Sequence, residues 1–205
     1  MTTTTRYFEI SILGDDQDKE LCFIESEPEE LGGFGYRLAE GDPTDDIFPK
    51  GSATIHLDPY ATGLGLPDII GNSIGFLIVS TAVKEILATH EVRPAEIKPL
   101  SIFSHKGRLH SRDYWIVNPL RFVDCLNRGA SKIQYSAADP SQIVGIDKLV
   151  FDGSALGALE KGGDRPDLFR IREQRMGYFL SERLVQALQG NGFTNLFLHE
   201  IAVQD

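Results

Sequence analysis

Hydrophobic residues recur at every second position in some stretches, which predicts strands, and at every third or fourth position in others, which predicts short helices. Near-alternating aromatic and β-branched residues predict an opening strand over residues 6–13, and residues 23–24 indicate a second one. Charges, prolines and glycines dominate residues 25–51. We therefore expect loops there, with one short strand at residues 34–38.

The clearest helix signal follows an apolar run. Residues 76–79 predict a strand, and the hydroxyl of Ser80 can accept a hydrogen bond from a free amide at the start of a helix. Apolar residues then recur at helical spacing. This pattern predicts a helix over residues 81–89.

A hairpin and a second helix are expected next. Residues 100–103 and 114–117 predict two strands joined by a polar turn at residues 105–112. Asn118 can cap a helix, and the proline after it lacks an amide that would be unpaired at a first helical position. The sequence therefore predicts a helix over residues 119–128.

The last third of the chain alternates strands and short helices again. The elements expected there are a strand at 143–151, a short helix at 155–161, a hairpin of 168–172 with 178–180, a helix capped by Ser181, and a strand at 193–201. Residues 75–87 and 177–188 share an order of glycine, strand, capping serine and helix, a weak internal similarity.

These elements predict an α+β protein, built on mostly antiparallel sheet with a few short amphipathic helices. The length of 205 residues fits a single domain spanning residues 1–205. Within it we distinguish an acidic, loop-rich segment at about residues 15–51 from a body at about residues 67–201.

The charge is concentrated in the acidic segment. Between Asp15 and Asp46 twelve acids face two bases, and this excess equals the formal net charge of −10 for the whole chain. Such a field attracts basic partners and repels nucleic acid, so we expect no nucleic-acid partner. The candidate partner-binding residues are Asp15, Asp16, Asp18, Glu20, Glu27, Glu29, Glu30, Asp42, Asp45 and Asp46. The alternative is that these acids serve only solubility.

Other features argue against a membrane, a metal or a cofactor. No run of about 18 apolar residues occurs, and the polar start resembles no export signal, so we expect a cytoplasmic protein without membrane contact. Cys22 and Cys125 lack the spacing of a metal site, and Cys125, placed on the helix at residues 119–128, is expected to be a buried packing residue. Gly63 and Gly71 begin turns rather than phosphate loops.

A catalytic alternative remains open. His105, His110 and Asp113 lie close together in the sequence and could form an acid–base set, although a hairpin turn is polar in any case. This alternative, a small enzyme of unassigned reaction, predicts a pocket that converges on one of the histidines. Arg170 and Arg172 could contact an anion from the solvent face of their strand.

Several stretches together resemble a known bacterial family. They are Tyr7-Phe8, the 76–80 strand with its helix, Asp113-Tyr114-Trp115-Ile116-Val117-Asn118, Asp124-Cys125-Leu126, Leu168-Phe169-Arg170-Ile171 and Phe179-Leu180-Ser181-Glu182-Arg183-Leu184. In this combination the chain is similar to the immunity proteins of polymorphic toxin systems, a family best represented in myxobacteria and formerly a domain of unknown function.

The resemblance implies a role without marking a site. Such proteins are thought to bind and neutralise a cognate toxin encoded by an adjacent gene, by forming a stoichiometric complex without turnover or cofactor. The expectation is therefore a binding protein rather than an enzyme. A third possibility is a structural or regulatory module that is fused to larger proteins.

Overall fold

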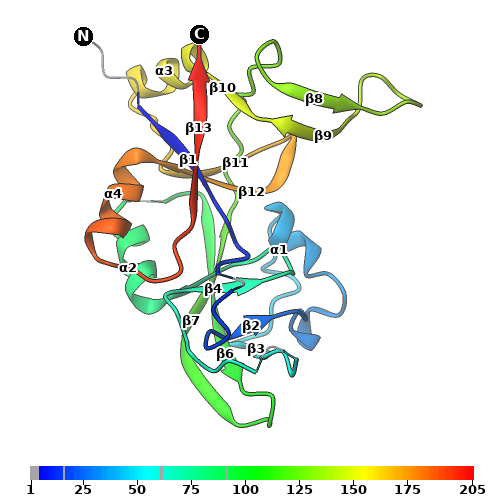
Figure 1. The fold of residues 1–205 in the computed structure, drawn as a ribbon, viewed down its shortest axis with the longest axis vertical. Helices are drawn as coiled ribbons and strands as arrows, with labels where there is room; N and C mark the ends of the chain where they lie inside the picture. The colour runs from blue at the N-terminus through cyan, green and yellow to red at the C-terminus, as the bar shows by residue number, and fades with distance from the viewer. Residues whose placement is uncertain (1–4, 16, 61, 91) are drawn as a thin grey trace.

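The computed structural model describes residues 5–15, 17–60, 62–90 and 92–205, and its strands form two main sheets and a separate hairpin (Figure 1). The first sheet has five strands in the order β10-β13-β1-β12-β11. Its strands are β1 Tyr7–Ile10, β10 Val150–Asp152, β11 Leu168–Ile171, β12 Gln174–Ser181 and β13 Leu198–Gln204. The opening strand thus lies in the middle of this sheet, between two C-terminal strands.

The second sheet has six strands in the order β2-β4-β5-β7-β6-β3. They are β2 Phe23–Ile24, β3 Ala53–His56, β4 Ile69–Asn72, β5 Leu77–Ser80, β6 Ala95–Phe103 and β7 Leu109–Pro119. The separate hairpin is formed by β8 Lys132–Tyr135 and β9 Ile143–Lys148, and it projects from the body at the upper right of Figure 1. The acidic segment therefore supplies the edge strand β2 and loops to the second sheet.

The prediction of mostly antiparallel sheets needs one correction, because both main sheets are mixed. The pairs β10/β13, β2/β4 and β3/β6 are parallel, and the remaining pairs are antiparallel. Each parallel pair lies at the edge of its sheet. The α+β class holds, and two of the antiparallel pairs, β6/β7 and β11/β12, are the hairpins that were expected.

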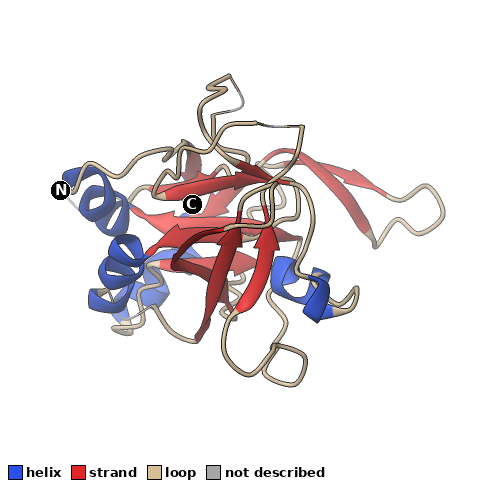
Figure 2. Ribbon diagram, turned by 90° about the horizontal axis from the view of Figure 1, so that it is seen from below, coloured by secondary structure: helices blue, strands red, loops and turns tan. Residues whose placement is uncertain are grey.

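Helices lie at the periphery of the strands (Figure 2). The structure contains α1 Tyr36–Glu40, α2 Thr81–Thr89, α3 Gly153–Lys161, α4 Glu182–Gly190 and the 3-10 turn η1 Glu29–Leu31. The predicted helices at residues 81–89, 155–161 and after Ser181 are confirmed, and the serine caps hold as expected. None of the helices in the described ranges is both long and apolar enough to cross a membrane.

The internal similarity is larger in the structure than in the sequence pattern. In each unit a hairpin runs into a serine-capped helix: β4–β5–α2 and β11–β12–α4. Ser80 donates to Asp68 at 2.9 Å, and Ser181 donates to Asp167 at 2.5 Å. In both units an aspartate at the start of the hairpin fixes the serine that caps the helix, so the repeat extends back to a Pro-Asp pair.

Three hydrophobic clusters hold the layers together. One packs the six-stranded sheet against the N-terminal segment and includes Ile24, Leu38 and Ile78. A second joins α2 and α4 to both sheets, and a third packs α3 against aromatic residues such as Phe151 of the five-stranded sheet. Apolar burial at about 25 cal/mol per Å² makes these clusters the main stabilising contribution to the fold.

The predicted helix at residues 119–128 is wrong. Strand β7 continues through Asn118 and Pro119, and Pro119 lies opposite Ala95 in the ladder with β6. The amide of Asn118 donates to the carbonyl of Asp42 at 2.9 Å instead of capping a helix. Beyond β7 the chain is extended and forms isolated bridges at Phe122 and Leu126. Tertiary pairing has overridden a strong local signal.

Other elements differ from the prediction. The expected strand at residues 34–38 is wrong, because residues 36–40 form α1. The expected strand at 143–151 is divided into β9 and β10, and β13 begins five residues later than the expected strand at 193–201. Strands β3, β4 and β8 were not predicted. Each of them is only four residues long, which gives periodicity little to detect.

Candidate partner-binding site

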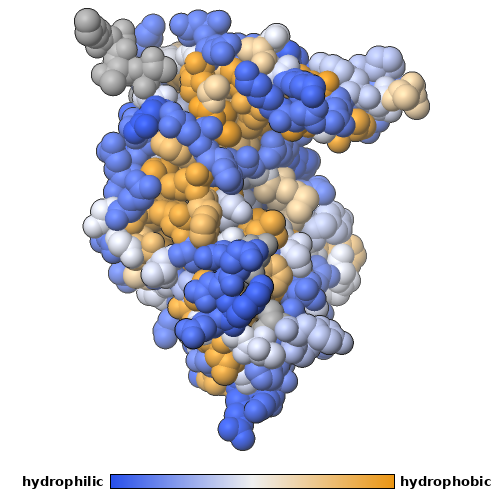
Figure 3. Space-filling view, in the orientation of Figure 1, coloured by the Kyte–Doolittle hydropathy of each residue, from blue (hydrophilic) through white to orange (hydrophobic). Residues whose placement is uncertain are grey.

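The acidic segment folds in two parts that differ in what surrounds their carboxylates. The first part, residues 15–30, runs from the end of β1 through β2 to η1, and the second, residues 40–46, follows α1. On the face shown in Figure 3, hydrophilic side chains gather over the stretch between β1 and β2. Asp16, one of the candidate residues, lies outside the described residues.

The carboxylates of the second part are paired with cations from elsewhere in the chain. Asp42 pairs with Arg175, Asp45 with Lys98, and Asp46 with Arg37 at 2.9 Å. The Arg37 hydrogen bonds lower the pKa of Asp46 below its ordinary value, because they favour the charged carboxylate. This part of the segment is therefore largely neutralised by the fold itself.

A partly buried glutamate of β6, Glu96, holds the same loop to that strand. Glu96 accepts hydrogen bonds from the amide of Thr44 at 2.9 Å and from its hydroxyl at 2.6 Å. It also accepts one from Asn118 at 3.1 Å, and Thr44 is fully buried. The loop that carries Asp42, Asp45 and Asp46 is thus held by long-range contacts that cannot be predicted from its own sequence.

Arg170 corrects the prediction of a solvent-facing arginine cluster. Its side chain is fully buried, stacks on the ring of Tyr178 at 4.1 Å and forms no ion pair with any described carboxylate. It donates to the carbonyls of Ala39 at 2.7 Å and Leu38 at 3.0 Å, the unpaired end of helix α1. It also donates to the carbonyls of Pro119 and Arg175. Arg172 is exposed, as expected.

The described carboxylates of the first part accept hydrogen bonds from backbone amides. Asp15 accepts from the amide of Gln17 at 3.0 Å, and Asp18 accepts from the amide of Glu20 at 2.9 Å. Glu30 accepts from the amide of Thr54 at 3.2 Å. Within the described residues, no carboxylate of residues 15–30 forms an ion pair. Their negative charge therefore remains available to solvent and to a partner.

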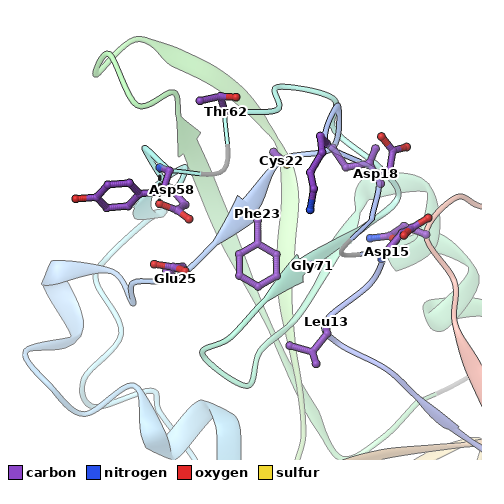
Figure 4. Close-up of a pocket in the computed structure, with 13 residues that line it drawn as sticks. Leu13, Asp15, Asp18, Cys22, Phe23, Glu25, Asp58, Thr62 and Gly71 are labelled. Carbon is purple, nitrogen blue, oxygen red and sulfur yellow. Dashed lines mark hydrogen bonds between the residues drawn. The ribbon is translucent and has the colours of Figure 1, made fainter.

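A cavity of about 480 Å³ opens beside this first part (Figure 4). Its residues are Leu13, Asp15, Asp18, Lys19, Leu21, Cys22, Phe23, Glu25, Asp58, Tyr60, Thr62, Gly71 and Asn195. Four carboxylates and one lysine thus surround an apolar floor. Gly71 is required here, because a Cβ atom at that position would lie 2.5 Å from the carbonyl oxygen of Leu13.

Asp58 is the feature of this cavity that the sequence analysis missed. The residue is only 5% exposed, and its Oδ1 accepts one hydrogen bond, from the amide of Tyr60 at 2.8 Å. Its Oδ2 has no partner among the described residues. The alternation of Ala53, Ile55 and Leu57 was the available signal, because it predicts a strand that delivers Asp58 at its end.

The two cysteines behave as packing residues. Cys22 lies in the cavity wall and Cys125 in the cluster under α3, and both are free and buried. Burial raises the pKa of each thiol to about 12, so neither is a thiolate at neutral pH. The expected burial of Cys125 is confirmed, although it lies on an extended segment rather than a helix.

The arginines on either side of Asp124 pair with carboxylates from other parts of the chain. Arg121 pairs with Asp164 at 2.8 Å, and Arg128 pairs with Glu173 at 2.8 Å. Asp124 is exposed. The basic residues after β7 therefore tie that extended segment to the region around α3 and β11.

The catalytic alternative gains no support from the placement of the histidines. His105 lies in the turn between β6 and β7, while His110 is in β7 and contacts the carbonyl oxygen of Leu64 at 2.8 Å. Neither histidine lines the cavity of Figure 4 or the second cavity, beside Phe122. Among the described residues, no group of three metal-type ligands lies close enough to hold an ion.

One known protein family matches nearly the whole chain. The profile described as the immunity protein family, Imm11, matches residues 6–203. A search of curated proteins gave no match. The matched range includes both main sheets, the acidic segment and the cavity of Figure 4. The chain therefore belongs to the Imm11 immunity protein family.

Proposed function

We propose that this protein binds a cognate toxin and neutralises it as a stoichiometric complex, without chemical turnover. Family membership supports an immunity role in general. The observation that carries the finer proposal is the set of described carboxylates at residues 15–30, none of which forms an ion pair with another described residue. Unpaired charge on one face supplies attraction to a basic partner without any rearrangement of the protein.

The electrostatics favour a basic protein surface as the partner. Complementary charge accelerates association, up to about 10⁸–10⁹ M⁻¹s⁻¹ at low salt, and this effect is screened within a Debye length of about 8 Å at physiological ionic strength. Nucleic acid carries the same sign of charge as the acidic face and would be repelled. We place the complex in the cytoplasm of the producing cell, where a toxin would have to be held inactive before export.

The experiment is co-expression with the product of the adjacent gene, followed by kinetics of binding at two salt concentrations. We expect a 1:1 complex that protects cells from the neighbouring product. Its association rate should fall several-fold between about 50 and about 500 mM salt. A neighbouring product that is harmless alone and does not bind would contradict the proposal.

A further inference from the structure

We propose that the cavity beside β2 receives an arginine side chain of the partner protein, with Asp58 as its buried acceptor. This inference rests on the proposed function and names the anchor of the interface. The cavity is not simply a group of surface acids, because it holds an aspartate that is only 5% exposed and whose Oδ2 accepts no hydrogen bond from a described residue. That oxygen is open to a cation or a donor that enters the cavity.

The lining matches the two halves of an arginine side chain. Leu13, Leu21 and Phe23 provide apolar surface for the methylene stem, while Asp58 and Glu25 provide acceptors for the guanidinium. In the view of Figure 4, the Phe23 ring lies between the Glu25 and Asp58 carboxylates on one side and those of Asp15 and Asp18 on the other. An aromatic face beside carboxylates suits a planar cation, which can stack and accept bidentate contacts.

The size and spacing of the site favour an organic cation over a metal ion. A volume of about 480 Å³ falls in the range of about 300–1,000 Å³ that is usual for pockets holding small molecules or large side chains. The carboxylates are too dispersed to form a metal-type cluster within the described residues. The four carboxylates outnumber Lys19, the lysine in the lining, so the site carries an excess of negative charge.

The rim adds an aromatic contact of the kind that anchors interfaces. The Tyr60 side chain is 90% exposed although its backbone amide is fixed by Asp58. Exposed aromatic residues around a charged pocket are typical of the residues that contribute most to binding energy in protein interfaces. Tyr60 could close over the stem of an inserted arginine while Asp58 holds its head.

The first test uses the isolated protein and needs no toxin. Nα-acetyl-L-argininamide is titrated into ¹⁵N-labelled protein and followed by amide chemical shifts, with Nα-acetyl-L-citrullinamide as the neutral isostere. We expect argininamide to shift the amides of Leu21, Phe23 and Gly71, and citrullinamide to leave them in place. Equal effects of the two probes, tighter binding of Nα-acetyl-L-lysinamide, or shifts scattered over the acidic surface would overturn the assignment.

Matched variants separate the buried acceptor from the general field. Asp58→Asn keeps an oxygen for the Tyr60 amide and removes one charge, and Glu85→Gln removes one charge from an exposed position on α2, outside the acidic segment and the cavity. Asp58→Asn should weaken argininamide binding about tenfold, as expected for loss of a charged hydrogen bond. Glu85→Gln should change it less than about twofold. Equal weakening by both variants would contradict a built site.

The same variants in the toxin complex distinguish this inference from the proposed function. Asp58→Asn should raise the dissociation rate of the complex about tenfold, whereas Glu85→Gln should leave it within about twofold. A complex that forms normally with Asp58→Asn would overturn the anchor while the proposed function stands. Argininamide binding without any toxin complex would overturn the proposed function and leave the arginine selectivity of the cavity intact.

Discussion

The two parts of the acidic segment have a similar density of acids in the sequence but differ in the fold in how many of their carboxylates form ion pairs. Residues 15–30 contain eight acids and residues 40–46 contain four, about one acid in every two residues in both cases. The second part pairs with Arg37, Lys98 and Arg175, while no ion pair joins the described carboxylates of the first part to another described residue. Charge counted along a sequence therefore overstates the field that a folded segment presents.

The difference also separates stability from binding. The second part is attached to both main sheets, through Arg175 of β12, which donates to the carbonyl of Glu40, and through Glu96 of β6. The first part surrounds a cavity and leaves its charges to solvent. Variants of the second part should therefore act mainly on the free energy of unfolding, and variants of the first part mainly on association with a partner.

The largest expected effect comes from the residue that holds α1. Arg170→Met would remove the donor from the carbonyls of Leu38, Ala39, Pro119 and Arg175 and leave them buried. We expect a loss of about 3–5 kcal/mol in the free energy of unfolding, measured by urea denaturation. The exposed neighbour provides the control: Arg172→Met should change stability by less than about 0.5 kcal/mol. Similar losses in both variants would contradict the anchoring role.

This arginine also shows where the sequence analysis reached its limit. Strand alternation placed Arg170 and Arg172 on one solvent face, but all four residues of β11 are buried. Leu168 packs in the cluster around α2 and α4, and Phe169 packs in the cluster under α3, so both faces of the strand are covered. Alternation along a strand identifies a solvent-facing side only where one face of the strand is exposed to water. In β11 neither face is exposed, and Arg172 is exposed because it lies just beyond the end of the strand.

The elements that were predicted correctly are those whose start is encoded locally. Ser80 and Ser181 cap their helices with distances of 3.4 and 3.3 Å to the third amide beyond them, and apolar spacing continues each helix. Asn118-Pro119 carried an equally good local signal and failed, because β6 supplied a pairing partner that the sequence does not show. The cavity was missed for a similar reason, since Asp58, Phe23 and Leu13 meet only in the folded chain.

The next effect concerns the attachment of the second part to β6. Glu96→Gln would present an amide group where the Thr44 amide and hydroxyl need acceptors. We expect a loss of about 1–3 kcal/mol in urea denaturation, because buried donors lose their partner. Glu85→Gln, on the exposed face of α2, should stay within about 0.5 kcal/mol of the parent protein. An equally small effect of Glu96→Gln would show that the loop is held by other contacts.

Association kinetics offer a direct comparison of the two parts. Asp15→Asn with Asp18→Asn removes two unpaired charges and keeps the acceptor oxygens for Gln17 and Glu20. Asp45→Asn with Asp46→Asn removes two charges from ion-paired positions. The first double variant should slow association with the neighbouring gene product a few-fold at low salt and flatten its salt dependence, and the second should have a smaller effect. The reverse order would contradict the division.

The smallest effect is the titration of the exposed pair at the edge of the second part. The Arg37 hydrogen bonds hold the pKa of Asp46 below its ordinary value, so the pair stabilises the fold above the ordinary carboxyl pKa of about 4. That contribution is lost as the pH falls through the lowered pKa of the folded state. Arg37→Gln should raise the pKa of Asp46, followed through its carboxyl carbon by NMR.

Arg6→Gln is the matched control, because Arg6 lowers the pKa of Glu182 in the same way. It should raise the pKa of Glu182 and leave that of Asp46 unchanged. If Arg37→Gln leaves the pKa of Asp46 unchanged, this carboxylate belongs with the unpaired ones, and the field of the acidic segment extends over both of its parts.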